Sequence, residues 1–295
     1  MKLLFWFDAT RPKTLLASIA PVLIGLAVSY SDNNMSIPRP FVAVLTIVCA
    51  LLIQIGSNIS NDLFDFINGA DNADRVGPNR AAQSGLLSEK ELARGIIIVF
   101  ALAVLIGSYL FFISLSPAII AIGIFSIAMA ILYTGGPYPL GYFGLGDVLV
   151  FIFFGIIPVQ GTYLLQLDAW SYSGLIYGIL IGFVATSILV VNNLRDIDTD
   201  KKAGKYTLAV IFGKRFAMAE YILLLSASCI GLSYIAYLAD RVIMYFAICA
   251  LAPITCILIW GIITKTGTEL NKLLVATSLY CFIYSILISL VVIVR

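Results

Sequence analysis

Long apolar stretches separated by polar connections occupy most of this chain. A helix that crosses a bilayer needs about 17–25 mostly apolar residues, and nine stretches approach or reach that length. They cover approximately residues 14–30, 40–61, 95–113, 117–134, 147–166, 173–194, 216–238, 242–263 and 272–294. None alternates polar and apolar positions as the strands of a membrane barrel do. Because backbone groups cannot stay unpaired in lipid, the pattern predicts nine transmembrane helices.

The composition also indicates an integral membrane protein. Of the 295 residues, 61% are hydrophobic and 12% are charged, whereas about a quarter of the residues in a soluble domain are charged. We therefore predict an all-α, polytopic membrane protein in which residues 1–295 form a single domain. The net charge of +2 gives no reason to expect a nucleic-acid partner. Asp8, Arg11 and Lys13 interrupt the first apolar residues, so we do not expect a cleaved signal peptide.

Lysine and arginine residues divide unevenly between the two ends of a nine-helix arrangement. Of the 18 basic residues, three fall on one side, namely Arg39, Arg241 and Arg295, and all the others fall on the opposite side. The positive-inside rule assigns the basic side to the cytoplasm. The two long polar connections, residues 62–94 and 195–215, also lie on this side. Because functional loops usually share one face of a scaffold, we expect the functional face to be cytoplasmic.

The cysteines and the lack of histidine limit the possible chemistry. Each cysteine lies inside an apolar stretch without the spacing of a metal site, so all are expected to be reduced and buried. They are Cys49, Cys229, Cys249, Cys256 and Cys281. Since the chain contains no histidine, acid–base chemistry must use carboxylates, lysine, tyrosine or water. Any bound metal is expected to be a hard ion held by oxygen atoms.

The first acidic segment directly follows the second apolar stretch. If the helix continues, Asn58, Asp62 and Asp65 share one face, because they are spaced by four and three residues. Asn61 forms a similar four-residue pair with Asp65, and Asp71 follows in the connection. Clustered carboxylates repel each other unless a cation lies between them. Mg²⁺ suits such a cluster, since it binds one or two carboxylates together with substrate phosphates.

The second acidic segment follows the sixth apolar stretch and repeats this spacing. Asn192, Asp196 and Asp200 are four residues apart and are expected on one face, with Asn193 beside them. Asp198 points elsewhere and is expected to be solvated. Two such faces could hold two Mg²⁺ ions around one diphosphate group. Helix caps and solvated loop charges are the alternative interpretation.

Basic residues that could bind phosphate oxygens follow both acidic segments. They are Arg75, Arg80, Lys201, Lys202 and Lys205. Arg11 and Lys13, which precede the first apolar stretch, are further candidates for phosphate binding. The alternative is that these residues only set the orientation of the chain in the membrane.

A glycine- and proline-rich connection follows the fourth apolar stretch. Residues 133–147 contain five glycines and two prolines and cannot continue a helix. Tyr133, Tyr138 and Tyr142 are expected at the cytoplasmic interface. They could belong to an aromatic belt or form a wall of the active-site cavity, where their rings would shield a cationic intermediate. Asp147 could cap the helix that follows.

Together, these motifs resemble those of the UbiA superfamily of intramembrane prenyltransferases. Its second motif, DxxxD, is intact at Asp196–Asp200, and its first, NDxxDxxxD, begins at Asn61. Gly69 stands where the general motif has its third aspartate, and Asp71 follows two positions later. This form is similar to that of the 1,4-dihydroxy-2-naphthoate polyprenyltransferases. The resemblance extends along nearly the whole chain, through residues 11–14, 20–25, 74–80, 142–155, 192–196 and 204–208.

The resemblance implies a bundle of nine helices around a central cavity that opens to the cytoplasm and laterally to lipid. It implies an enzyme of the plasma (inner) membrane with Mg²⁺ as cofactor and two substrates, a polyprenyl diphosphate and 1,4-dihydroxy-2-naphthoate. The metal would be held by Asn58, Asp62, Asp65, Asp196 and Asp200, and the lipid tail would lie in an apolar groove. An allylic cation would form, and the ring carbon bearing the carboxylate would attack it. Loss of CO₂ would then give demethylmenaquinol.

Several alternatives stay open at this point. Asp65, Asp71 or a water molecule could accept the hydroxyl proton of the acceptor. Another aromatic acceptor, such as 4-hydroxybenzoate or homogentisate, or a phytyl donor would suit the same superfamily. A CDP-alcohol phosphotransferase has its aspartates in one segment, whereas Asp62 and Asp196 are 134 residues apart. An ion-coupled transporter would need acidic residues near the middle of the bilayer, and nearly all acidic residues here lie at or beyond the predicted helix ends. The sequence does not indicate an oligomeric state.

Overall fold

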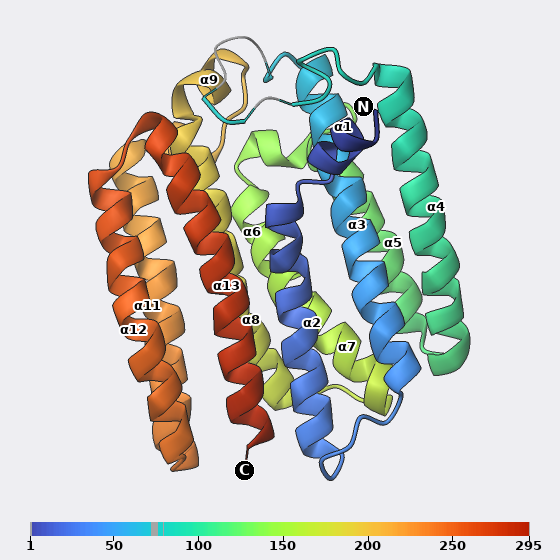
Figure 1. Cartoon of the computed structure of the whole chain (residues 1–295), viewed down its shortest axis with the longest axis vertical. Coiled ribbons are helices and arrows are strands. Elements are labelled where there is room, and N and C mark those ends of the chain that lie inside the picture. Colours follow the sequence, from blue (N-terminus) through green and yellow to red (C-terminus); the bar gives the residue numbers. More distant parts are fainter. Residues whose placement is uncertain (1, 72–75, 79, 295) are drawn as a thin grey trace.

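The computed structural model describes residues 2–71, 76–78 and 80–294, which form an all-helical bundle (Figure 1). Its long helices are α2 (Pro12–Asp32), α3 (Pro40–Ile67), α4 (Glu89–Ser114), α5 (Pro117–Leu132), α8 (Tyr172–Arg195), α11 (Lys214–Ala239), α12 (Val242–Thr264) and α13 (Leu270–Ile293). A further long segment consists of α6 (Gly146–Phe151), one π-helical turn (Ile152–Ile156) and α7 (Ile157–Leu167). The short helices are α1 (Lys2–Ala9), η1 (Leu140–Phe143), α9 (Ile197–Lys202), α10 (Leu208–Phe212) and η3 (Gly267–Glu269).

Each predicted apolar stretch coincides with one of the long helical segments. Eight of these segments are long and apolar enough to cross a membrane. The remaining one, α5, has 16 residues, or about 24 Å at the α-helical rise, which is shorter than a hydrocarbon core of about 30 Å. The all-α membrane architecture predicted from the sequence is therefore confirmed, with one helix shorter than expected. The protein is an integral membrane protein.

The local sequence explains where several helices begin. Proline occupies the first turn of α2, α3 and α5, where its missing N–H would have no helical partner. At the start of α4, Ser88 and Glu91 form a reciprocal capping box, which satisfies two backbone donors. These signals fix the entry points of four helices at the polar edges of the bundle.

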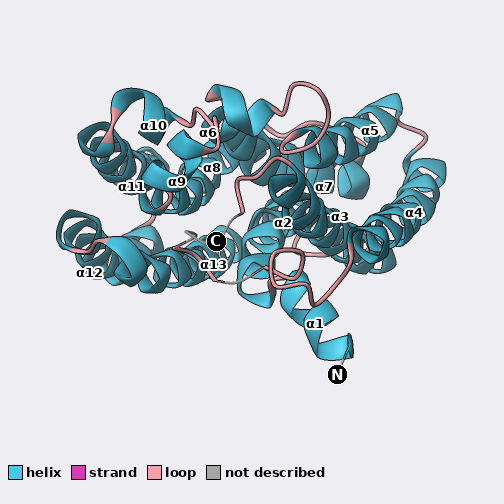
Figure 2. Cartoon of the chain, turned by 90° about the horizontal axis from the view of Figure 1, so that it is seen from above, coloured by secondary structure: helices cyan, strands magenta, loops and turns pink. Residues whose placement is uncertain are grey.

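Close helix packing places the segment Gly146–Leu167 against α8. An added Cβ on Gly155 would lie 2.5 Å from the Cα of Gly182, so the two backbones approach as closely as glycine allows. Such contacts between small residues are typical of helices packed inside a membrane. Elsewhere, α2 packs against α13 and α7, and α8 packs against α11 and α13 (Figure 2).

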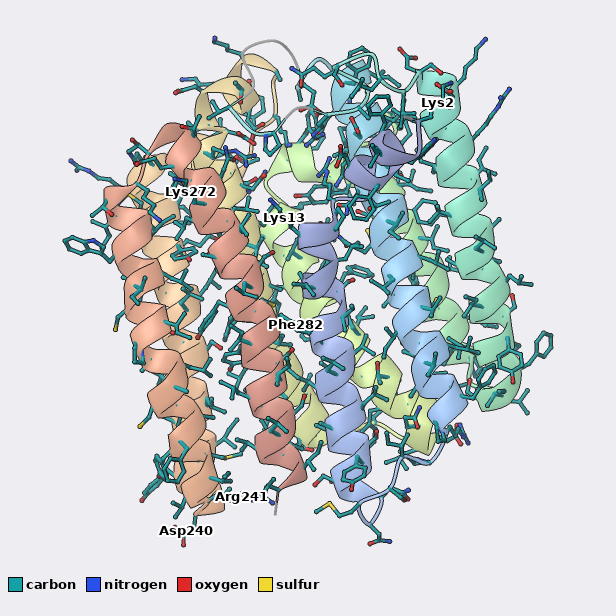
Figure 3. The ribbon with its side chains drawn as sticks, in the orientation of Figure 1. Lys2, Lys13, Asp240, Arg241, Lys272 and Phe282 are labelled. Atoms are coloured by element: carbon teal, nitrogen blue, oxygen red, sulfur yellow. The ribbon has the colours of Figure 1, made fainter. Side chains whose placement is uncertain are left out.

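The two ends of the bundle carry different charged residues. Lys2 and Lys272 lie at one end, whereas Asp240 and Arg241 lie at the other (Figure 3). This division agrees with the sides predicted from the sequence for the three basic residues. Helices α3 and α8 both end at the first of the two ends, as do most of the short helices (Figure 1). The acidic segments that follow α3 and α8 therefore come together at that end.

The cysteines of the described chain are all free, as their spacing predicted. The prediction that all are buried is wrong for Cys249 and Cys256, whose side chains are exposed on α12. A thiol behaves as a small apolar group, so hydropathy alone cannot separate an inward from an outward position on a helix of a membrane bundle.

Candidate active site

A tight turn after α3 brings the carboxylates of the first acidic segment together. Gly69 has a φ of +76°, a conformation that glycine adopts readily. The turn allows the backbone N–H groups of Ala70 and Asp71 to donate to the carbonyl oxygen of Asp65. It thereby folds Asp71 back beside Asp65, and both side chains are almost fully buried. The glycine that replaces the third aspartate of the general motif is thus the residue that makes this turn.

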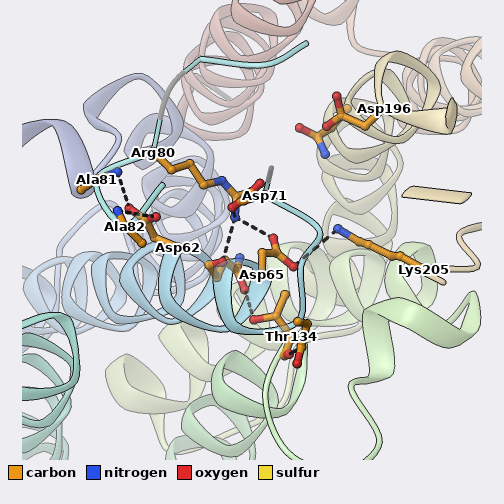
Figure 4. A network of polar contacts seen from close by, with 12 residues as sticks. Asp62, Asp65, Asp71, Arg80, Ala81, Ala82, Thr134, Asp196 and Lys205 are labelled. Atoms are coloured by element: carbon orange, nitrogen blue, oxygen red, sulfur yellow. Dashed lines mark hydrogen bonds and ion pairs between the residues drawn. The ribbon is translucent and has the colours of Figure 1, made fainter. Parts of the chain in front are cut away.

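Arg80 joins the carboxylates of this segment. Its Nη1 lies 2.6 Å from Asp65 Oδ2 and 2.5 Å from Asp71 Oδ2, and it donates to the carbonyl oxygen of Asn61. Burial alone would lower the pKa of Arg80, but the adjacent carboxylates of Asp65 and Asp71 raise it above its ordinary value. Arg80 therefore stays charged and compensates part of the negative charge around it (Figure 4).

Asp62 holds the connection that carries Arg80. Its two carboxylate oxygens accept hydrogen bonds from the backbone N–H groups of Ala81, at 3.1 Å, and Ala82, at 3.3 Å (Figure 4). The side chain is only 2% exposed, so these bonds replace hydration that the carboxylate loses on burial. They also fix the position of Arg80 opposite Asp65.

The second acidic segment lies at a break between two helices. Helix α8 ends at Arg195 and α9 follows, so Asp196 lies between them. The carboxylate of Asp196 accepts hydrogen bonds from Arg195 Nε, at 2.8 Å, and Nη2, at 2.6 Å. Arg195 also donates to Asn192 Oδ1 and to Asn271 Oδ1 on α13, each at 2.8 Å. The break means that the predicted four-residue face is not one straight helical stripe.

Lys205 connects the two acidic segments. Its Nζ lies 3.9 Å from Asp65 Oδ1 and 3.8 Å from Asp200 Oδ1. The same ammonium group lies 5.4 Å from the centroid of the Tyr142 ring, within the range of a cation–π interaction. The hydroxyl of Tyr142 donates to Asp65 Oδ1 at 2.9 Å. Carboxylates from α3 and α9 therefore meet at one buried cation, and Figure 4 shows its contact with Asp65.

The three tyrosines of the glycine-rich connection lie in different environments. Tyr133 packs against Gly146, where an added Cβ would lie 2.8 Å from the tyrosine hydroxyl oxygen. Burial, and next to it the nearby carboxylates, raise the pKa of Tyr133 and Tyr142 above its ordinary range. Both phenols therefore stay protonated. Tyr138 is 73% exposed and packs against Phe143, away from the buried charges.

An apolar groove with a volume of about 190 Å³ runs from Tyr133 into the bundle. It lies between α2, α3, α5 and the segment Gly146–Leu167, with α4 completing one wall. Gln54, on its α3 wall, donates to the side chain of Asn58, one helical turn before Asp62. The groove therefore reaches the part of α3 that directly precedes the first acidic segment.

The sequence profile of the UbiA prenyltransferase family matches residues 18–288, which is most of the chain. The chain belongs to the UbiA prenyltransferase family. A 1,4-dihydroxy-2-naphthoate octaprenyltransferase of Haemophilus influenzae is 36% identical over 300 residues, covering 98% of this chain and 96% of its own length. One from Mycobacterium tuberculosis is 40% identical over 208 residues and covers 70% of each chain. The predicted superfamily is confirmed, and the protein is a prenyltransferase.

Solved structures of UbiA homologues share the fold. The homologue from Archaeoglobus fulgidus bound to DMAPP and Mg²⁺ has a TM-score of 0.67 and 17% identity, covering 96% of this chain and 99% of that one. The apo homologue from Aeropyrum pernix K1 has a TM-score of 0.69 and 14% identity, covering 90% and 94%. At such low identities the likeness shows the fold alone.

The donor atoms of this UbiA site suit a hard cation. Among the described residues, no three carboxylate or thiol side chains are grouped closely enough to form a ready metal cluster. However, Lys205 shows that Asp65 and Asp200 can hold a positive charge between them. The acidic side chains at this site offer carboxylate oxygens, which are the donor atoms that Mg²⁺ prefers. The oxygen donors of this site therefore fit a hard divalent cation.

Asparagines predicted near the metal have protein partners. Asn58 donates to the carbonyl oxygen of Thr10 and to the hydroxyl of Thr14, so it ties α3 to the start of α2. Asn61 accepts a hydrogen bond from the Thr134 hydroxyl at 2.9 Å (Figure 4). These amides position the connections around the site.

The remaining predicted site residues separate into buried and exposed ones. Asn193 is buried in α8, and Arg11 is half-buried at the start of α2. Lys13, Lys201, Lys202 and Asp198 are exposed, and for Asp198 this was the prediction. Arg75 lies outside the residues that the structure describes.

Asp147 does not cap α6. The cap position is Leu145, which makes no side-chain capping hydrogen bond. The carboxylate of Asp147 is buried instead, so the suggested capping role is wrong.

Sequence reasoning missed Arg195, Asn271 and Thr134 as parts of the site. Arg195 was predicted only to orient the chain and to belong to the 192–196 stretch of the family resemblance, and Asn271 lies 76 residues further along the chain. No local spacing links these two positions, because α13 returns to the site through tertiary packing. The buried state of Arg195 could not be read from a motif that otherwise looks like a helix end.

Proposed function

We propose that this protein transfers a polyprenyl group from a polyprenyl diphosphate to 1,4-dihydroxy-2-naphthoate, with Mg²⁺ as cofactor. The C–O bond to the diphosphate breaks, a C–C bond forms at the ring carbon bearing the carboxylate, and CO₂ leaves. The products are demethylmenaquinol, CO₂ and pyrophosphate, and the reaction belongs to menaquinone synthesis. The names of the bacterial relatives, at 36% and 40% identity, support this choice of acceptor.

The observation that carries the proposal is the position of Lys205 between the two acidic segments. Its contacts to Asp65 and Asp200 indicate that a positive charge is accommodated where α3 and α9 meet. The solved homologue with DMAPP and Mg²⁺ supports the use of a divalent metal by this fold. We propose that Asp62, Asp65, Asp196 and Asp200 hold the metal in this chain.

The chain supplies its own cations to the leaving group. When bound, Mg²⁺ would act as a Lewis acid that neutralises the diphosphate. Arg80 and Lys205 are buried beside the carboxylates, so a diphosphate entering the site would offer them new acceptors. We propose that both side chains then bind phosphate oxygens and stabilise the charge that develops as the C–O bond breaks.

The apolar groove suits the prenyl tail of the donor. It begins at Tyr133 and is lined on α3 and the π-helical turn by apolar side chains such as Ile53 and Phe153. The faces of Tyr133 and Tyr142 lie near the point where an allylic cation would form, and aromatic rings attract cations. Because both phenols stay protonated, they can also donate hydrogen bonds to phosphate oxygens or to the acceptor.

Two carboxylates are candidates for the group that accepts the hydroxyl proton of the acceptor. Asp65 and Asp71 both bind Arg80, which opposes protonation of either one. If Arg80 turns to the diphosphate, the nearby carboxylate regains basicity. A water molecule held by these groups is the alternative. Loss of CO₂ takes the place of a ring proton, so no further base is needed on that carbon.

We place this reaction at the cytoplasmic face of the plasma (inner) membrane. The end that carries both acidic segments also carries most of the lysine and arginine residues in the sequence, and the positive-inside rule assigns such an end to the cytoplasm. The diphosphate, which carries several charges, would then enter from water while its tail stays in lipid.

The proposed acceptor is tested by offering the purified protein several aromatic acids. The reaction would contain Mg²⁺, octaprenyl diphosphate and either 1,4-dihydroxy-2-naphthoate, 4-hydroxybenzoate or homogentisate, with products identified by mass spectrometry. We expect the prenylated product of 1,4-dihydroxy-2-naphthoate to form fastest, with a mass that shows the loss of CO₂. Chelation of the metal should stop its formation. Faster formation of a prenylated hydroxybenzoate that keeps its carboxylate would show that the acceptor is wrong. The same assay with a phytyl diphosphate would test the choice of donor.

A further inference from the structure

Two glycines interrupt the side-chain lining of the apolar groove. Gly107 on α4 and Gly123 on α5 both line it. A Cβ added at either position would meet no other atom within 4 Å. By contrast, a Cβ at Gly161, on the opposite wall, would touch Ile122 at 3.4 Å. Open space therefore adjoins Gly107 and Gly123.

The two glycines lie at the same depth in the bundle. Helices α4 and α5 are antiparallel neighbours joined at Leu115 and Ser116. Gly107 lies eight residues before Leu115, and Gly123 lies seven residues after Ser116. An equal helical rise on each side brings both positions to one level. The missing side chains thus leave one opening in the lining rather than two separate gaps.

This level lies well below the Tyr133 end of the groove and above its floor. Gly123 is ten residues from Tyr133 along α5, or about 15 Å at the helical rise. Beyond the glycines, the lining residues Leu110, Ile119 and Leu165 are buried in a hydrophobic cluster. A short tail that starts beside Tyr133 ends before the glycine level, whereas a long tail must pass it.

We propose that Gly107 and Gly123 determine how long a prenyl tail the enzyme accepts. The open space beside them lets a long tail continue past the middle of the groove, where side chains would otherwise block it. This inference rests on the proposed function, because it takes the occupant of the groove to be the tail of the diphosphate donor. It assigns a role to two positions that carry no polar chemistry and belong to no acidic motif.

The experiment compares a short and a long donor in variants that fill the opening. Gly123→Leu and Gly107→Leu place a bulky side chain in open space, so both variants are expected to fold. For octaprenyl diphosphate we expect kcat/KM to fall by at least about tenfold, the scale on which an apolar pocket discriminates by size. For geranyl diphosphate, whose tail ends before Gly123, we expect a change of less than about twofold.

Three control variants separate filling of the groove from other effects. Ala121→Leu and Ala101→Leu add the same side chain to exposed positions of α5 and α4, outside the groove lining, and should leave both donors unaffected. Gly123→Ala favours the helix while adding only one methyl group, and should lower kcat/KM for octaprenyl diphosphate only slightly. Thermal unfolding of each variant in detergent checks that the fold is retained.

The possible results distinguish this inference from the proposed function. If wild type uses both donors and the leucine variants treat them alike, the inference is wrong and the proposed function stands. If wild type transfers neither prenyl group to any aromatic acid, the proposed function is wrong. Displacement of a bound geranyl diphosphate analogue by octaprenyl diphosphate provides a readout without turnover. We expect the leucine variants to weaken that competition at least about tenfold.

Discussion

At the scale of single residues, buried cations hold the acidic site together. Five aspartates, Asp62, Asp65, Asp71, Asp196 and Asp200, are all at most 5% exposed, and carboxylates so deeply buried are costly unless paired. Asp65 and Asp71 share Arg80, Asp196 binds Arg195, and Lys205 contacts Asp65 and Asp200. Two of the cations that compensate these carboxylates, Arg80 and Lys205, are therefore the same groups that we propose bind the diphosphate.

The variant Lys205→Met tests whether this buried cation has a specific role, beyond its contribution to the positive charge of the cytoplasmic end. The substitution removes a buried ammonium group that contacts both Asp65 and Asp200. We expect turnover to fall by roughly 10²-fold, with weaker binding of the diphosphate donor, because a group that stabilises the leaving group is lost. Steady-state kinetics with measurement of released pyrophosphate would show it.

The matched control for this change is Lys201→Met. Lys201 lies four residues earlier and carries the same charge, but its side chain is exposed. We expect nearly wild-type kinetics, because an exposed charge contributes little. Equal losses in the two variants would mean that only overall charge matters, and would contradict the role given to Lys205.

The aspartates provide a second prediction at this scale. Replacement of Asp62, Asp65, Asp196 or Asp200 by alanine should each reduce turnover at least roughly 10²–10³-fold, the effect of removing one group that stabilises developing charge. Asp198→Ala, between the last two and exposed, should have almost no effect. Turnover at several Mg²⁺ concentrations is the measurement. Full activity of any of the four at low Mg²⁺ would disprove the two-segment metal site.

The sequence motifs predicted that the two acidic segments lie at the same end of the bundle, but not which residues neutralise their carboxylates. The order of the apolar stretches predicted that Asp65 and Asp200 lie near helix ends on the same side of the membrane. A motif is a local pattern, so it does not reveal partners that are distant in sequence. The bonds from Arg195 to Asn271 and from Tyr142 to Asp65 join positions with no sequence relation. The turn at Gly69 could be anticipated in part, since glycine favours positive φ, but the resulting contact of Asp71 with Arg80 could not.

At the scale of elements, the bundle depends on close contacts between helices. A Cβ on Gly155 would lie 2.5 Å from Gly182 Cα and 2.6 Å from the carbonyl oxygen of Gly178, so backbone rather than a flexible side chain would have to move. We predict that Gly155→Ala lowers stability by roughly 1–3 kcal/mol, as overpacking of a well-packed interior does. Thermal unfolding in detergent measures the change.

Gly107→Ala is the control for that prediction, since its added methyl group meets open space. It should leave stability unchanged or raise it slightly, because alanine favours a helix more than glycine does. A similar loss of stability in both variants would show that helix propensity or the detergent, and not the approach of α8, governs the result.

Hydropathy predicted every long helical segment because burial in lipid imposes an apolar composition on each one. It could not predict the irregular parts that shape the site. The π-helical turn at Ile152–Ile156 and the break at Asp196 leave the average hydropathy of their segments unchanged. Hydropathy also overestimated the length of α5. The predicted stretch included Tyr133 and Thr134, whereas the helix ends at Leu132.

At the scale of the whole molecule, the candidate site needs both halves of the chain. Asp65 lies in α3, Lys205 lies in the connection after α9, and Asn271 lies in α13. Helix α2 packs against α13, which brings the two ends of the sequence into one bundle. We therefore propose that residues 1–295 act as a single domain, since neither half contains the set of charges that binds and neutralises the diphosphate.

The orientation of this bundle in the membrane makes the last prediction. Lys201 is an exposed residue of α9, which lies at the end with the acidic segments (Figure 1), and Asp240 is exposed at the opposite end (Figure 3). In a background with the exposed Cys249 and Cys256 changed to serine, Lys201→Cys should be protected from a membrane-impermeant thiol reagent in intact cells, and Asp240→Cys should react. Opening the cells should make the position at 201 reactive, because the positive-inside rule places it in the cytoplasm. Reaction at 201 before the cells are opened would show that the topology is the reverse of the predicted one, with the proposed diphosphate site facing away from the cytoplasm.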